Sequence, residues 1–230
     1  MSQIHFIGGE KGGVGKSVVA RALAQYFIDR HVNFAGIDAD TSHNVLARYY
    51  AHHTQTIDLT QFSSTDQIMD RALGAERQVL VDLPAQSSRQ LKQWMHAGGI
   101  LSFAREMGVA LKFWHVTDGG FDSVQQLHSL TQEFGDTIDY VVVKNEGRSG
   151  DFTQFEESEV RQSLEQLNAS IITLPELHAA TMYKIDSKGS SFWAAVHSNA
   201  AELSLSPMES QRTKMWLDKT YFGLQSALGF

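Results

Sequence analysis

A glycine-rich run near the N-terminus carries lysines and a serine at a spacing that suits phosphate binding. It reads Lys11-Gly12-Gly13-Val14-Gly15-Lys16-Ser17 and is followed by Val18. Glycines allow successive backbone N–H groups to point inward at phosphate oxygens. In such loops a lysine placed like Lys16 reaches the β- and γ-phosphates, and a hydroxyl placed like that of Ser17 ligates Mg²⁺. We therefore expect ATP and Mg²⁺ to bind at residues 12–18.

Carboxylates follow two later apolar runs, where they can face the same phosphates. Asp38 and Asp40 lie at the end of the run 34–38, and Asp82 lies in the run 79–83. Residues two apart on a strand share a face, so Asp38 and Asp40 can both point towards the loop. A carboxylate such as Asp82 can hold a Mg²⁺-bound water, because this metal keeps much of its hydration shell. Solvated aspartates without a ligand are the alternative.

The elements that must position these residues alternate between short apolar runs and longer helical patterns. We expect strands at 4–7, 34–38, 79–83, 109–116, 138–143 and 170–174. Helices are expected at 16–30, 42–50, 64–73, 88–106, 121–134, 155–167 and about 207–228. This alternation predicts an α/β fold in which helices cover both faces of a mostly parallel, twisted sheet. No linker divides residues 1–230, so we expect one domain.

The run at 11–17 resembles the signature of the deviant Walker A ATPases, the family of ParA and MinD, at every position. Glu10 replaces the first glycine of the usual loop, and Lys11 is an added lysine. The resemblance implies a three-layer P-loop NTPase fold and a homodimer that encloses ATP. It implies that Lys11 crosses the dimer interface to the partner's phosphates, and that Asp40 positions or polarises the attacking water. Asp38 would lie near Mg²⁺ and Lys16.

Later segments resemble the same family more weakly. The segment 79–85 resembles its Walker B strand, with Ala85 where relatives often have glycine. Asn145 ends a strand at the place where relatives contact the nucleotide base, and Pro175 follows the strand that flanks the adenine. Asp118, in Thr117-Asp118-Gly119-Gly120, also lies at this edge. We interpret that segment mainly as a turn and helix cap, with nucleotide or partner contact as the alternative.

The resemblance implies an ATP-driven switch that hydrolyses slowly and positions cargo. Short length and the Asp-Leu-Pro-Ala segment at 82–85 favour the small plasmid-stability or conjugative-transfer members (StbB- or TraL-like). We expect a protein partner that stimulates hydrolysis, and DNA bound directly or through an adaptor. A membrane-associated MinD-like positioning ATPase and a metabolic ATP-dependent ligase on the same fold are the alternatives.

Composition narrows these choices. The chain has no cysteine, which excludes disulfides, thiolate metal sites and a cysteine-held iron–sulfur cluster, and suits a cytoplasmic protein. Its net charge of −7 means that DNA binding would need a local basic patch. No apolar run approaches the roughly 20 residues of a membrane span. The helix expected at 207–228 could pack on the domain, bind a partner or contact a membrane; packing is favoured, and membrane contact least.

Overall fold

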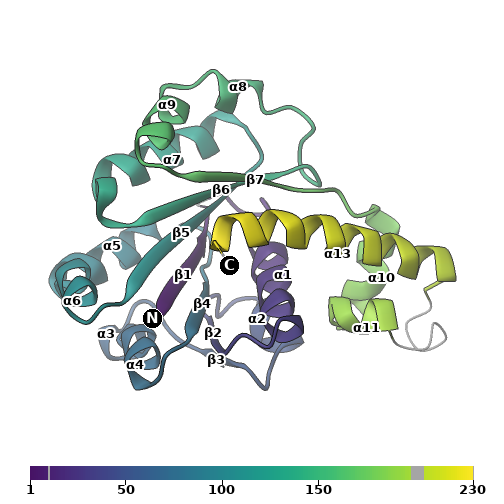
Figure 1. The fold of residues 1–230 in the computed structure, drawn as a ribbon, viewed down its shortest axis with the longest axis horizontal. Coiled ribbons are helices and arrows are strands. Elements are labelled where there is room, and N and C mark those ends of the chain that lie inside the picture. Colours follow the sequence, from purple (N-terminus) through teal and green to yellow (C-terminus); the bar gives the residue numbers. More distant parts are fainter. Residues whose placement is uncertain (10, 198–204, 230) are drawn as a thin grey trace.

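Seven parallel strands form the centre of the computed structural model, which describes residues 1–9, 11–197 and 205–229. The strands are β1 (Gln3–Gly8), β2 (Phe34–Asp38), β3 (Thr54–Thr56), β4 (Gln78–Asp82), β5 (Ala110–Thr117), β6 (Asp139–Asn145) and β7 (Ser170–Leu174). Their order is β3-β2-β4-β1-β5-β6-β7 (Figure 1). The six expected strands are confirmed, and the sheet is parallel throughout.

Helices cover both faces of this sheet, as the expected three-layer architecture requires. One face packs against α1 (Lys16–Asp29), α2 (Val45–Tyr49), α10 (Ala179–Ser187), α11 (Phe192–His197) and α13 (Pro207–Leu228). The other packs against α4 (Gln67–Gly74), α5 (Ser88–Ala97), α6 (Ile100–Glu106), α7 (Phe121–Phe134), α8 (Thr153–Glu156) and α9 (Glu159–Gln166). Strands buried on both faces account for the continuous apolar runs that marked them in the sequence.

Several expected helices are shorter or divided, each for a local reason. The helix expected at 88–106 breaks between α5 and α6 because Gly99 has a φ of 57°. The one expected at 42–50 begins only at Val45, since Asn44 is left-handed with a φ of 47°. The range 64–73 holds the end of α3 (Phe62–Thr65) and then α4, and Ser158 caps a new helix after α8 within 155–167. Strand β3 was missed because Thr54-Gln55-Thr56 has no apolar residue.

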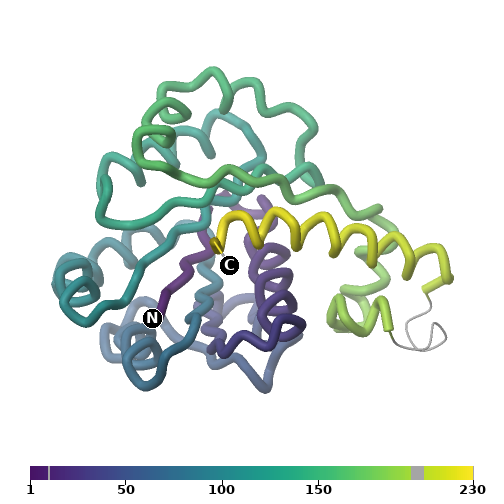
Figure 2. The backbone as a smooth tube through the Cα atoms, viewed as in Figure 1, coloured from purple at the N-terminus to yellow at the C-terminus, as the bar shows by residue number. Residues whose placement is uncertain are grey.

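The C-terminal helix α13 packs on the sheet, as the favoured reading expected. Its first turn carries a capping box in which the Ser206 hydroxyl accepts from Glu209 N, and the Glu209 carboxylate accepts from Ser206 N. Trp216, Leu217 and Leu224 are buried against the domain. At the other end Lys112 Nζ donates to the Ala227 carbonyl at 2.8 Å, so the last turn of α13 lies in front of the central strands (Figure 2).

Among the described residues, no helix is long and apolar enough to cross a membrane. The ends of the parallel strands instead bring the polar segments together. β1 and β4 run side by side, and so do β2 and β4, with Asp38 directly opposite Asp82. Carboxyl ends of parallel strands meet at one edge of a sheet, and ligands of open α/β sheets bind there.

Two buried histidines give the fold a predicted pH dependence. His5 Nδ1 accepts from Trp114 Nε1 at 3.1 Å, so its other nitrogen, Nε2–H, donates to Gln78 Oε1 at 2.7 Å. Burial is the main cause that lowers the pKa of His5, and likewise that of His115, to about 4. At these two residues the unfolded state then binds more protons than the folded state between pH 6.5 and 4, so their contribution lowers stability as the pH falls through this window.

We expect each imidazole to cost about 2 kcal/mol of unfolding free energy between pH 7 and pH 5. In the wild type the raised pKa of Asp82 acts in the opposite direction, so urea unfolding of an Asp82→Asn variant at the two pH values measures the loss, and an NMR titration of His5 measures its pKa. A His5 pKa near 6.5 would contradict the prediction, because a histidine with its usual pKa contributes no such loss.

Candidate functional site

The phosphate loop joins β1 to α1 at the carboxyl edge of the sheet, where the sequence predicted it. Gly13 and Gly15 have φ values of 78° and 104°, in the left-handed region that glycine tolerates best. A side chain at Gly15 would also collide with Asn145, because an added Cβ would lie 2.2 Å from Asn145 Nδ2. Gly12 has neither constraint, since nothing lies within 4 Å of its would-be Cβ.

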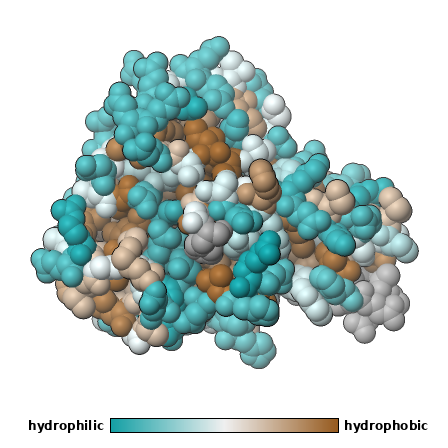
Figure 3. All heavy atoms as spheres, in the orientation of Figure 1, coloured by the Kyte–Doolittle hydropathy of each residue, from teal (hydrophilic) through white to brown (hydrophobic). Residues whose placement is uncertain are grey.

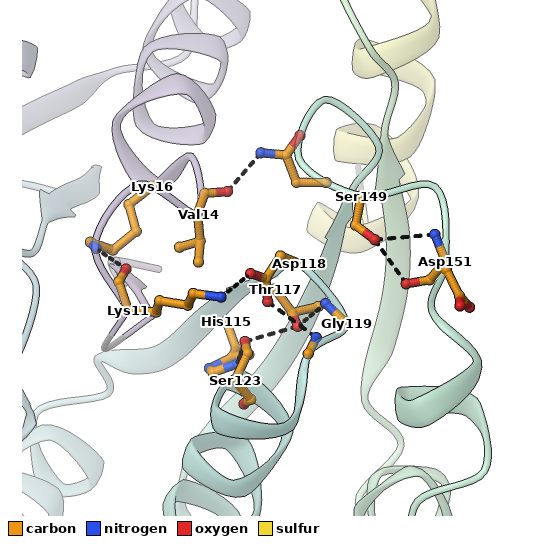
Figure 4. Close-up of polar contacts among 12 residues, drawn as sticks. Lys11, Val14, Lys16, His115, Thr117, Asp118, Gly119, Ser123, Ser149 and Asp151 are labelled. Atoms are coloured by element: carbon orange, nitrogen blue, oxygen red, sulfur yellow. Dashed lines mark hydrogen bonds and ion pairs between the residues drawn. The ribbon is translucent and has the colours of Figure 1, made fainter.

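Lys16 is folded back across this loop. Its side chain is buried, and Nζ donates to the Lys11 carbonyl at 3.2 Å (Figure 4). A buried ammonium group beside the loop and the N-terminus of α1 makes an electropositive cradle. The geometry therefore suits an anion with several oxygens, which is the chemistry of a triphosphate.

Asn145 reaches the same loop from the end of β6. Its Nδ2 donates to the Val14 carbonyl at 2.7 Å, and its Oδ1 accepts from Gly147 N at 3.0 Å. Both ends of the amide are therefore engaged in holding the loop to the turn after β6. Pro175 follows β7, and its carbonyl accepts from Trp216 Nε1 at 2.7 Å. Contacts of Asn145 and Pro175 with a nucleotide base stay a prediction.

Asp82 is a buried carboxylate that interacts with the Ser17 side chain. Both of its oxygens are inaccessible, and neither has a hydrogen-bond partner of ordinary geometry among the described residues. Burial, helped by the neighbouring charge of Asp38, raises the pKa of Asp82 to about 8, against the opposing influence of Ser17 and Lys16. Such a group is costly unless a ligand satisfies it. A hard cation held between Asp82 and the Ser17 hydroxyl fits this requirement.

Asp38 is equally buried but its oxygens are occupied. Oδ1 accepts from Asp40 N and Oδ2 from Ala47 N, each at 3.0 Å. Burial raises the pKa of Asp38, and these two N–H groups oppose that rise. Asp38 therefore holds the segment 40–47 to the end of β2. The expected position of Asp38 near Mg²⁺ stays a prediction.

Asp40 lies at the mouth of the site on this same segment. Its Oδ1 accepts from Ser42 N at 3.1 Å and His43 N at 3.3 Å, and its Oδ2 lies 3.1 Å from His43 Nδ1. Its side chain is 18% exposed, which leaves it open to solvent. A fixed carboxylate at this place can orient a water molecule, as its expected role requires.

Lys11 is held by a residue 107 positions away in the sequence. Its Nζ lies 2.5 Å from Asp118 Oδ2, and the Lys11 side chain remains 47% exposed (Figure 4). Burial is the largest single influence on Asp118 and raises its pKa, but the hydrogen bonds from Lys11 and Gly120 N and the charge of Lys11 together outweigh burial and leave the pKa lowered. The turn reading of this segment is confirmed by Gly120 N donating to Asp118 Oδ1. Its pairing with Lys11 was not foreseen.

Comparison with known proteins decides the family. The family model described as the CobQ/CobB/MinD/ParA nucleotide binding domain matches residues 5–187. The chain belongs to this family. A protein TraL of Escherichia coli is 25% identical over 79% of this chain and 80% of its own length. A protein MobD of Acidithiobacillus ferrooxidans is 28% identical over 87% and 91%.

Solved structures agree on the fold of this CobQ/CobB/MinD/ParA member. The cell division ATPase MinD of Pyrococcus furiosus matches with a TM-score of 0.55 and 16% identity. The match covers 98% of this chain and 99% of that one. At this identity the likeness shows the fold alone. The family model describes a nucleotide binding domain, and this edge of the sheet is the candidate site for the nucleotide.

Arg21 is a further buried group of this family member that the sequence did not single out. It lies on α1 one turn beyond Lys16 and is 2% exposed. Its guanidinium lies 2.7 Å from Asp186 on α10 and stacks over the Tyr49 ring at 3.7 Å. Phe192 covers it on another side, 4.5 Å from the ring centroid. An arginine in a helical pattern gives no signal of such burial, because the partners come from α2, α10 and α11.

Proposed function

We propose that this chain binds and hydrolyses ATP, dimerises around it, and acts as a switch in conjugative transfer, plasmid stability or DNA partition. The nucleotide-binding family supports the ATP part. Similarity to proteins named TraL and MobD supports the transfer branch of the resemblance. A stimulating protein partner, DNA as cargo and a cytoplasmic location belong to the same proposal. DNA binding that requires ATP and weakens steeply with salt would support the DNA part.

One observation carries the proposal, namely the different treatment of the two loop lysines. Lys16 is buried within its own loop, whereas Lys11 extends from the rim with half of its side chain exposed. The buried lysine suits phosphates bound in the same subunit. The exposed lysine can extend to phosphates bound in a second subunit. A cation placed there stabilises charge that develops on a transferring phosphoryl group.

Mg²⁺ completes the proposed site. Ser17 and Asp82 would hold it, the second through its unpartnered carboxylate, and when bound the ion neutralises charge on phosphate oxygens. The loop N–H groups and Lys16 would bind phosphate, Asp40 would orient water, and Asp38 would hold the segment that carries Asp40 in place.

Replacing Asp82 tests the metal role. We expect Asp82→Asn to reduce Mg²⁺-dependent hydrolysis about a hundredfold, because the amide cannot offer a charged oxygen to the cation. The melting temperature of the protein without nucleotide should stay the same or rise, since a buried unpaired carboxylate is removed. Full activity in this variant would exclude Asp82 as a metal group, and a lower melting temperature would give it a structural role instead.

Releasing Lys11 from Asp118 tests dimerisation. An ATP analogue that resists hydrolysis should convert the wild-type chain from monomer to dimer, as measured by sedimentation velocity. We expect Asp118→Asn to strengthen that dimer several-fold, because Lys11 no longer has to break an ion pair before it crosses to the partner. Asp122→Asn is the matched control, since Asp122 lies in the first turn of α7 and acts on Lys11 through its charge without a hydrogen bond. A weaker dimer in Asp118→Asn would contradict the proposed route.

A second candidate is supported by a cavity beside the loop. It measures about 270 Å³ and is lined by Gly9, Ser88, His115 and Gln126 among others. A metabolic ligase on this fold would need such a pocket for its second substrate. The ligase reading predicts that a small carboxylic or amine substrate accelerates ATP consumption in a monomer, whereas the switch reading predicts acceleration only by a macromolecular partner.

A further inference from the structure

Helix α13 keeps an exposed apolar row after its buried face has been satisfied. Met208, Met215 and Phe222 are 60%, 49% and 81% exposed. Their spacing of seven residues places them on one side of the helix, over about 21 Å of its length. Brown and tan side chains lie along this front of the molecule among teal ones (Figure 3). Large apolar side chains repeated in this way are unusual for a surface that faces only water.

The row borders a groove rather than a flat surface. One cavity of about 500 Å³ lies between α13 and the segment 175–178. A second of about 360 Å³ lies between α13 and β7. Pro175 and Lys219 line both cavities, so the two form one continuous groove. Met208 and Met215 border the first, and Phe222 borders the second.

Two cationic side chains, seven residues apart on α13, also line this groove. Arg212 and Lys219 are exposed, and neither has an ion pair among the described residues. Among the residues that the structure describes, Glu176 is the one acidic residue that borders the groove. The row is therefore locally positive on a chain whose net charge is −7. An apolar row beside a basic row of the same period is the pattern that pairs with a helix carrying leucines flanked by glutamates.

We propose that this groove, lined by α13, β7 and residues 175–178, binds an amphipathic helix of a partner protein that carries carboxylates beside a row of apolar side chains. Methionines at two of the three apolar positions suit a surface that adapts to a partner helix. The concave shape favours a rod-like occupant over a bilayer, which needs a protruding apolar face. The inference does not depend on ATP-driven dimerisation.

A charge-swap experiment tests the proposal on the full chain. The probe is a synthetic 21-residue helical peptide with leucine at seven-residue spacing and glutamate on both flanks, and a second peptide has lysine for each glutamate. Fluorescence anisotropy measures binding. We expect the glutamate peptide to bind the wild type at least tenfold more tightly than the lysine peptide. Arg212→Glu combined with Lys219→Glu should reverse that preference, because both flanking contacts change sign.

Matched variants separate the groove from the general charge of the protein. Lys188→Glu combined with Lys214→Glu changes the net charge equally, but neither residue borders the groove. This control should keep the wild-type preference within twofold. Met215→Ser and Phe222→Ser should each weaken the glutamate peptide about tenfold, since each removes a large apolar contact. All four sites are exposed, and circular dichroism checks that the variants fold.

Three results would overturn the inference. The first is equal affinity for both peptides or no binding of either. The second is binding to vesicles of phosphatidylcholine and phosphatidylglycerol, or to duplex DNA, that is lost on Arg212→Glu with Lys219→Glu while neither peptide binds. The third is self-association of the chain without peptide that the same pair of substitutions abolishes, because a second copy would then occupy the groove.

Discussion

Lys11→Ala is expected to lower ATP hydrolysis about a thousandfold and to remove ATP-dependent dimerisation, while ATP binding to the monomer stays within about threefold of wild type. A trans-acting cation contributes on the order of 10³ or more to phosphoryl transfer in comparable nucleotide hydrolases. The Lys16 cradle is intact in this variant, so the monomer keeps its phosphate contacts. Turnover, sedimentation with an ATP analogue and equilibrium binding of ADP measure the three quantities separately.

The control for this prediction is Lys188→Ala, which removes an exposed lysine of α10's C-cap far along the chain from the loop. It should leave all three measurements unchanged. Solvent-exposed ion pairs contribute little to stability, so Lys11→Ala should melt within a few degrees of wild type. Hydrolysis and dimerisation at wild-type levels in Lys11→Ala would show that this lysine does not act across an interface.

Gly15→Ala is expected to weaken ATP binding at least about a hundredfold. The added Cβ would lie 2.2 Å from Asn145 Nδ2, and the φ of 104° is strained for any L side chain. Relief requires Asn145 to move, and that movement breaks its hydrogen bond to the Val14 carbonyl. The loop would lose the conformation that the positive φ values of Gly13 and Gly15 define. Isothermal titration with ATP and Mg²⁺ measures the loss.

Two other glycines of the same loop give a graded comparison. Gly12→Ala meets no atom within 4 Å and has no positive φ, so binding should change less than threefold. Gly13→Ala meets no atom but has a φ of 78°, so it carries the backbone strain without the collision and should fall between the two. Equal losses for Gly12→Ala and Gly15→Ala would contradict the collision as the cause.

The parts of the fold that the sequence predicted are those with strong local signals. Buried parallel strands gave continuous apolar runs, as at Val79-Leu80-Val81, and the glycines of the loop marked the turn into α1. β3 gave no signal because its three residues are polar and rely on pairing with β2. The break after α5 lies at Gly99, which adopts a left-handed conformation. The sequence alone does not show that this glycine adopts it.

The candidate site divides along the same line. Local patterns in the sequence predicted the loop that holds Lys16 and Ser17 and the strand end that holds Asp82. The engagement of Asp38 with Ala47, the hold of Asn145 on Val14 and the Lys11–Asp118 pair involve partners distant in the sequence or on other elements. A single sequence carries no signal for such pairings, because aspartate, asparagine and lysine are also common on ordinary solvated surfaces.

The ion pairs of α10 have a mechanical consequence. Arg21 lies on α1, which begins at the phosphate loop, and forms an ion pair with Asp186 of α10. Lys184, two residues before Asp186 on the same helix, forms an ion pair with Glu209 in the first turn of α13. Helix α10 thus links α1, which begins at the phosphate loop, to the C-terminal helix that borders the groove. Each pair joins a mostly buried side chain, Arg21 or Glu209, to one that is 42% (Asp186) or 40% (Lys184) exposed. A displacement of α1 would therefore reach α13 through two ion pairs that are each open to solvent on one side.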